Sequence, residues 1–193
     1  MDIIKNMNNK LIIVTGFVAT GKTTFSQKLS NTLNIQCFNK DYIKAVLGEN
    51  LDIETSVQKS RLSVTSFNLI MHIIENFMEK QKPIIVESNF KILEGQKINE
   101  LIIKYNYDAL TFLMLGDLKT LHKRFVERDD KPERDKANRS EGAFNDYDKF
   151  EKAIKPLGEF NIGGKILKID ASNFSNINYE KYIEEAKSFL NLQ

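Results

Sequence analysis

An eight-residue segment, residues 16–23, limits most strongly how this chain can fold. It has the spacing Gly-x-x-x-x-Gly-Lys-Thr, with an apolar run at residues 11–15 before it and a stretch of helical periodicity at residues 22–33 after it. Glycine adopts backbone conformations that other residues avoid, so two glycines at this spacing allow a tight loop. The pattern predicts a buried strand, a glycine-bounded loop and a helix in direct succession.

The same loop predicts a nucleotide site. Backbone N–H groups in such a loop form a concave nest for phosphate oxygens, and the helix N-terminus adds partial positive charge. Lys22 would reach the β- and γ-phosphates and the Thr23 hydroxyl would bind Mg²⁺. The alternative is an ordinary turn that matches by accident. We expect ATP and Mg²⁺ to contact Gly16, Ala19, Thr20, Gly21, Lys22, Thr23 and Thr24.

The rest of the chain predicts an α/β fold. Five apolar runs without polar alternation are expected as strands, at residues 11–15, 35–38, 83–87, 109–115 and 165–169. Helical patterns separate them, at residues 22–33, 41–47, 56–80, 93–105, 118–128, 144–154 and 179–190. Such strands favour a five-stranded parallel sheet covered by helices on both faces, a three-layer sandwich formed by residues 1–193 as one domain. Its sites are expected at the carboxyl ends of the strands.

The composition argues against several other classes of protein. The net charge is only +2, with no stripe of basic and aromatic residues, so a nucleic-acid partner is not favoured. The single cysteine excludes an internal disulfide and a zinc cluster of thiolates. No apolar run reaches the roughly 18 residues that would span a bilayer, and no secretory signal is recognised. We expect a cytoplasmic protein, and its oligomeric state is left open.

Arginine is concentrated in one segment. The chain has 23 lysines and 5 arginines, and four of the arginines lie between Arg124 and Arg139. The planar guanidinium suits phosphate contacts and stacking, which predicts a ligand-facing segment. The alternative is a solvated surface helix, because acidic residues are interleaved there. The fifth arginine, Arg61, would be explained by an anionic substrate, or equally by an exposed helix position.

Four segments carry a resemblance to a known family. They are residues 16–24 (GFVATGKTT), 38–48 (FNKDYIKAVLG), 83–90 (PIIVESNF) and 124–128 (RFVER). In this order the chain resembles the P-loop kinase superfamily. Within it, the chain is similar to the AAA-type small-kinase branch that holds chloramphenicol phosphotransferase, zeta-toxin kinases and polynucleotide 5′-kinase domains. The resemblance implies a P-loop kinase fold with a helical lid at about residues 124–142.

The resemblance also implies roles for single residues. Asp41 would be the catalytic base that accepts the proton of the substrate hydroxyl, with a helix N-cap as the structural alternative. Glu87 would hold Mg²⁺ through water. Lys44, where many relatives have arginine, and Asn89 would contact the substrate.

The remaining roles concern the lid and the adenine pocket. By resemblance, Arg124 would stack on adenine and Arg128 would reach phosphate. Arg134 and Arg139 lie where they could close over the γ-phosphate and contact the substrate. The backbone around Ser172 would line the adenine pocket.

These features favour an ATP-dependent kinase that transfers the γ-phosphoryl group to a hydroxyl of a small molecule. A polynucleotide 5′-hydroxyl kinase and a zeta-toxin-like nucleotide-sugar kinase are the alternatives among enzymes. An ATP-binding switch module is the alternative of another class. The polar composition of residues 131–142, with Pro132 and Gly142, predicts a lid that is mobile without ligand.

Overall fold

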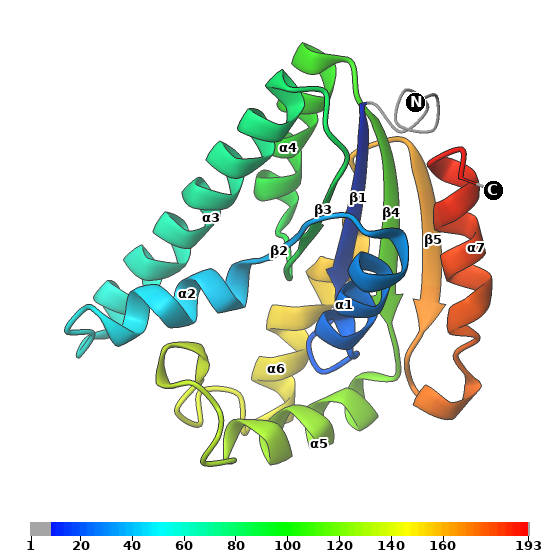
Figure 1. The fold of residues 1–193 in the computed structure, drawn as a ribbon. Coiled ribbons are helices and arrows are strands. Elements are labelled where there is room, and N and C mark those ends of the chain that lie inside the picture. Colours follow the sequence, from blue (N-terminus) through cyan, green and yellow to red (C-terminus); the bar gives the residue numbers. More distant parts are fainter. Residues whose placement is uncertain (1–8, 193) are drawn as a thin grey trace.

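A five-stranded, fully parallel sheet forms the centre of the protein (Figure 1). The computed structural model describes residues 9–192. The strands lie in the order β2-β3-β1-β4-β5, so the strand before the glycine loop is central. Their bounds are β1 (Lys10–Gly16), β2 (Cys37–Asn39), β3 (Ile84–Glu87), β4 (Asp108–Leu115) and β5 (Lys165–Asp170).

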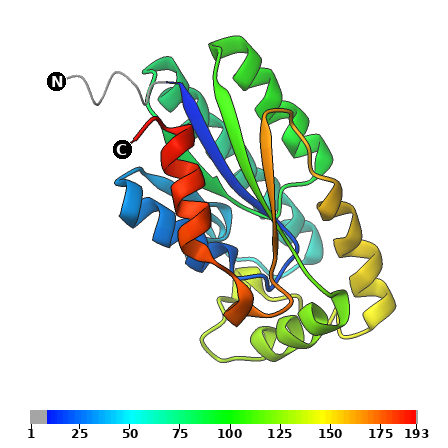
Figure 2. The same cartoon turned by 90° about the vertical axis from the view of Figure 1, so that its right-hand side faces the viewer.

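Helices connect the strands and cover both faces of the sheet (Figure 2). The α-helices are α1 (Lys22–Leu33), α2 (Lys40–Glu49), α3 (Ser56–Glu79), α4 (Ile92–Tyr105), α5 (Leu118–Asp129), α6 (Tyr147–Ile154) and α7 (Tyr179–Phe189). Short 3₁₀ helices are η2 (Lys136–Asn138), η3 (Lys155–Glu159) and η4 (Phe174–Asn176). None of the helices within residues 9–192 has the length and hydrophobicity needed to cross a membrane.

The three layers follow from alternation along the buried strands. In β1, Ile12 and Val14 pack with α1 and α7 on one face of the sheet. The neighbouring residues Leu11 and Ile13 pack with α3 and α4 on the other face. Side chains alternate between faces in a strand, so a strand covered on both sides is apolar throughout. The predicted three-layer α/β sandwich is confirmed.

A third apolar cluster lies beyond the carboxyl ends of the strands. Phe17 and Val18 of the glycine loop pack there against α5 and α6, where Phe150 is fully buried. Figure 1 shows these two helices below the sheet, on the side where β1 and β4 end. The cluster holds the loop against the helices that follow β4.

Most element boundaries differ from the sequence prediction by one or two residues, and three differences stand out. The second strand is Cys37–Asn39 rather than residues 35–38, and it pairs with β3 through Asn39 and Glu87. The sixth helix begins at Tyr147 rather than at residue 144, because Asp146 caps it by accepting from the Lys149 N–H. The second helix begins one residue before Asp41, for the reason given below.

Candidate active site

The glycine loop has the backbone that its sequence predicts. Gly16 has a φ of +119°, and a Cβ there would lie 2.2 Å from the carbonyl oxygen of Met114 on β4. Gly21 has a φ of +79° and precedes α1, where no side chain caps the first-turn N–H groups. A helix N-terminus of this kind attracts anions. Only glycine fits at residue 16, because β1 and β4 approach so closely.

Two side chains of the loop bind its own backbone. The Thr20 hydroxyl donates to the carbonyl oxygen of Phe17 at 2.9 Å, and the Lys22 ammonium donates to the same oxygen. Lys22 is buried, and burial lowers its pKa to about 8, while Glu87 and Asp41 act in the opposite direction. A buried cation beside a nest of N–H groups is suited to bind phosphate.

The parallel register places a carboxylate beside the loop. Glu87 ends β3 opposite Val14 of β1 and Asn39 of β2. Its Oε2 accepts a hydrogen bond from the Thr23 hydroxyl at 2.9 Å and another from the Asn39 amide. Burial raises the pKa of Glu87 to about 7, and the Lys22 charge opposes this rise.

The residues at this point fit a magnesium ion. The Thr23 hydroxyl and the Glu87 carboxylate are oxygen donors, which Mg²⁺ prefers, and a cation would offset the cost of burying the carboxylate. Residues 9–192 contain no group of three or more His, Cys, Asp or Glu side chains that could hold a metal. Mg²⁺ in proteins commonly relies on one or two carboxylates together with phosphate oxygens.

A cavity of about 850 Å³ opens at this edge of the sheet. It lies between the loop, α2, the end of β3, α5 and the segment around η2. Most of the predicted site residues line it, namely Ala19, Thr20, Gly21, Lys22, Thr23, Thr24, Asp41, Lys44, Glu87, Asn89, Arg124, Arg128, Arg134 and Arg139. Three predicted residues do not line it. Gly16 acts through its backbone, and Arg61 is exposed on α3. Ser172 accepts a hydrogen bond from Arg124 through its carbonyl oxygen and does not line the cavity.

Asp41 lies in the first turn of α2 and does not cap it. Asn39 is the N-cap, and its side-chain oxygen accepts from the Tyr42 N–H at 3.0 Å. The expectation of Asp41 as the cap is therefore wrong, because Asn39 at the end of β2 already supplies the acceptor. The carbonyl oxygen of Asp41 accepts from the Asn138 amide at 2.9 Å, while its carboxylate lines the cavity.

Arg124 is held in place by the segment after β5. Its guanidinium donates to the carbonyl oxygens of Ala171 and Ser172 at 2.6 and 2.7 Å, and stacks over the Phe174 ring at 4.1 Å. Phe174 is 41% exposed and lies near Gly21. Ser172 thus takes part through its carbonyl and holds the arginine, and Phe174 offers an aromatic face next to the loop.

The other three arginines of the segment differ in their partners. Arg139 donates to the carbonyl oxygens of Lys131, Pro132 and Arg134 and so folds the segment upon itself. Arg134 donates to the Asn138 carbonyl oxygen, and its Nε is buried without a partner. The Nε of Arg128 is also buried without a partner, and burial lowers its pKa.

The sequence assigned no role of their own to several residues that line the cavity, although Lys131 and Asn138 lie in the predicted lid. These residues are Lys40, Ser63, Ser88, Lys91, Lys131, Asn138 and Phe174. Lys40 and Ser88 immediately adjoin the predicted Asp41 and Glu87, so extending each strand end by one residue would have found them. Phe174 reaches the site only through the path of the chain after β5, for which the sequence carries no signal.

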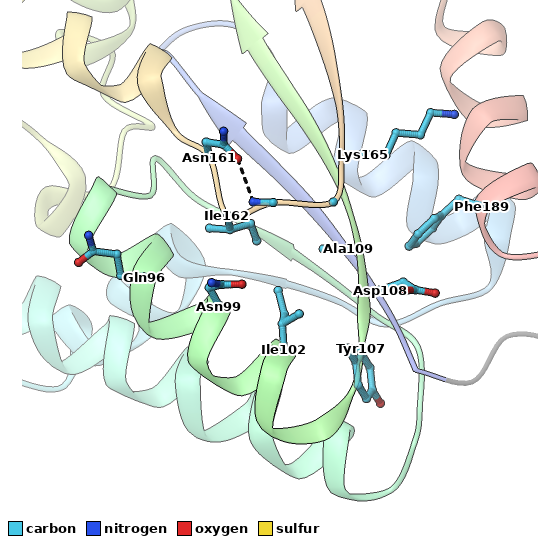
Figure 3. A pocket seen from close by; sticks show the side chains of 12 residues that line it. Gln96, Asn99, Ile102, Tyr107, Asp108, Ala109, Asn161, Ile162, Lys165 and Phe189 are labelled. Carbon is cyan, nitrogen blue, oxygen red and sulfur yellow. Dashed lines mark hydrogen bonds between the residues drawn. The ribbon is translucent and has the colours of Figure 1, made fainter.

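A second cavity of about 700 Å³ lies at the opposite end of the sheet (Figure 3). It is lined by the starts of β4 and β5, by α4 and by Phe189 of α7. Its charged side chains are paired within the fold, Asp108 with Lys10 and Lys165 with Glu185, each at 2.6 Å. It therefore lacks the free charged groups that the first cavity has.

Comparisons with known proteins show the fold. No protein-family model and no curated protein matches the sequence. A solved structure from Chloroflexus aurantiacus J-10-fl, described as a "putative kinase", is 24% identical with a TM-score of 0.81, covering 96% of this chain and 98% of that one. The tunicamycin resistance protein of Deinococcus radiodurans is 13% identical with a TM-score of 0.61, covering 96% and 97%. The shikimate kinase of Bacteroides thetaiotaomicron is 14% identical with a TM-score of 0.57, covering 94% and 98%.

The comparisons establish the architecture of this chain, an α/β fold around a parallel five-stranded sheet. The chain shares the five-stranded parallel sheet and its helices with these kinase structures over nearly its whole length. At such low identities the likeness establishes the architecture, and the chemistry has to be argued from the site itself.

Proposed function

We propose that this protein is an ATP-dependent kinase that transfers the γ-phosphoryl group to a hydroxyl of a small molecule. One observation carries the proposal: the phosphate loop with Lys22 and the carboxylates of Asp41 and Glu87 border the same cavity. A phosphate nest and a carboxylate that line one cavity suit phosphoryl transfer between two bound substrates. The kinase-fold neighbours, which include a shikimate kinase, agree with a small-molecule acceptor.

The loop and the arginines would bind and orient ATP. The N–H groups of the loop and Lys22 would hold the β- and γ-phosphates, and Arg128 would add charge where the transition state is most negative. Phe174 and Arg124 would border the adenine. Thr23 and Glu87 would hold Mg²⁺, which when bound neutralises phosphate charge and aligns the phosphate chain.

Asp41 would act on the acceptor. Its carboxylate would orient the hydroxyl and take its proton as the oxygen attacks the γ-phosphorus. The new O–P bond forms while the bond from the γ-phosphorus to the bridging oxygen breaks, and ADP leaves with that oxygen. The proposal includes membership of the small-kinase branch that residues 38–48 and 124–128 resemble.

An ATP-consumption screen tests the proposal. The protein is incubated with Mg²⁺–ATP and hydroxyl-bearing metabolites, with a 5′-hydroxyl oligonucleotide as a separate arm. We expect phosphorylation of a small molecule, and loss of most nucleotide affinity and turnover in Lys22→Ala with the fold retained. Unchanged affinity and turnover in Lys22→Ala would show that the loop is not the ATP site. Phosphorylation of the oligonucleotide alone would change the acceptor class.

A further inference from the structure

The cavity carries more positive charge than ATP requires. Nine lysines and arginines line it, against the three carboxylates of Asp41, Glu87 and Glu127. A Mg²⁺–ATP complex would neutralise only part of this excess. Because like charges gathered in a partly enclosed cleft repel each other, a second anion would stabilise the arrangement.

Several of these cations already have partners within the fold or are assigned to the proposed ATP site. Lys40 pairs with Glu94 at 3.3 Å, and the guanidinium groups of Arg124 and Arg139 are taken up by backbone carbonyls. Lys22 and Arg128 lie where the proposed ATP phosphates would bind. Lys91 and Lys131 are exposed at the rim.

Lys44 and Arg134 remain inside the cavity with unused charge. Among residues 9–192, Lys44 has no side-chain hydrogen bond or ion pair. Burial lowers its pKa, and the nearby Asp41 carboxylate opposes this. Arg134 uses one nitrogen to bind the Asn138 carbonyl oxygen, while its Nε is buried without a partner. A buried guanidinium nitrogen without a partner, beside a half-buried ammonium that also has none, indicates a ligand that supplies acceptors.

The two cations are brought to one place by the packing of η2 on α2. A Cβ at Gly48 of α2 would lie 2.6 Å from the Cβ of Ala137, and the Asn138 amide binds the Asp41 carbonyl. Lys44 follows Asp41 by three residues, so both lie on one face of α2 with their Cβ atoms about 5–6 Å apart. An anionic group bound by Lys44 would therefore lie close to the acceptor hydroxyl that Asp41 orients.

We propose that the phosphoryl acceptor is itself an anion, with a carboxylate or phosphate a few bonds from the reacting hydroxyl, held by Lys44 and Arg134. This inference rests on the proposed kinase function and deepens it. Ser88, whose buried hydroxyl has no partner and which lines the same cavity, is placed to accept or donate a further hydrogen bond to this acceptor.

Equilibrium binding to the protein loaded with Mg²⁺ and a non-hydrolysable ATP analogue tests the inference. The first titration, with the analogue alone, tests the proposed function. The second uses matched probes: gluconate against sorbitol for a carboxylate, and glycerol 3-phosphate against glycerol for a phosphate. We expect at least one anionic probe to bind and its neutral counterpart to bind roughly tenfold more weakly or worse.

Matched variants connect the binding to the two cations. Lys44→Gln and Arg134→Gln should each weaken the anionic probe by about tenfold and leave analogue affinity near that of the parent. Lys149→Gln and Arg61→Gln, which change exposed residues outside the cavity, should leave both affinities unchanged. The phosphate and carboxylate arms identify which anion fits.

The outcomes separate the two proposals. Failure of the analogue to bind would overturn the kinase function. Binding of the analogue with no preference for anionic probes, or with no anionic probe bound, would overturn the anionic acceptor alone. Equal weakening by Arg61→Gln and Arg134→Gln would also overturn it, because the effect would then reflect net charge rather than the cavity.

Discussion

Asp41 is a side chain whose chemistry can be tested apart from its structural role. Because Asn39 caps α2, Asp41→Asn removes the carboxylate charge without removing the cap. We expect near-normal stability and ATP affinity, and a fall in phosphoryl transfer of about 10²–10⁴-fold, the usual loss with a general base. Transfer to the true acceptor is the measurement. A parent-like rate would move the role of base to another group, with Glu87 the next candidate.

The buried carboxyl group of Glu87 should make the stability of the folded protein depend on pH. Burial raises its pKa from 4.5 to about 7 in the folded protein, so the folded state holds a proton that the unfolded state releases. The contribution of this group to stability therefore falls as the pH rises from about 4.5 to 7. Glu87→Gln stays neutral and keeps an oxygen that can accept from Thr23 and Asn39.

Without nucleotide or Mg²⁺, Glu87→Gln should melt at a higher temperature than the parent at pH 7, and this difference should shrink toward pH 5. Because the pKa of Lys22 is about 8, Lys22 stays charged from pH 5 to 7. The fall in stability over this window therefore comes from Glu87. Melting curves at both pH values provide the measurement. A difference in melting temperature that is the same at pH 5 and pH 7 would contradict the raised pKa of Glu87.

At the scale of elements, the segment after α5 determines whether the cavity is covered. Residues 131–142 contact α2 through Asn138 and Asp41, and contact α3 through the Glu141–Lys59 ion pair. These links are polar, and only Ala137 of η2 is buried. Polar segments with few buried apolar contacts open locally at low free-energy cost.

Hydrogen exchange should therefore show weak protection of residues 131–142 in the free protein and stronger protection with Mg²⁺ and a non-hydrolysable ATP analogue. Lys22→Ala treated in the same way provides the control, and its exchange should stay unchanged on addition of the analogue. Strong and equal protection in both states would instead indicate a rigid structural segment.

For the whole molecule, nucleotide binding should raise global stability. The cavity is bordered by the loop from β1 and by α5, which share one apolar cluster, and by α2, which packs on another. A ligand that binds only the folded state at 100 times its dissociation constant stabilises that state by about 2.7 kcal/mol. Thermal melts with Mg²⁺–ATP should show this shift, and Lys22→Ala should lose most of it. A shift retained by Lys22→Ala would place the nucleotide elsewhere.

The sequence by itself determined the class of fold and the conformation of the glycine loop. Both depend on local rules: two glycines, Lys22 and Thr23 at fixed spacing, and apolar runs that have to be buried on both faces. It also located Glu87 and Asp41 near the ends of strands β3 and β2, because all parallel strands end at the same edge of a sheet.

Only the tertiary structure decided how the remaining side chains are used. Asn39 caps α2 and binds Glu87 because β2 pairs with β3, a register that the three residues of β2 do not encode. The sequence left both Arg61 and Arg134 open as substrate contacts, yet one is exposed on α3 and the other lies in the cavity. Which arginine meets a ligand depends on where the segment after α5 packs, and that is set by contacts between residues distant in sequence, such as Gly48 with Ala137.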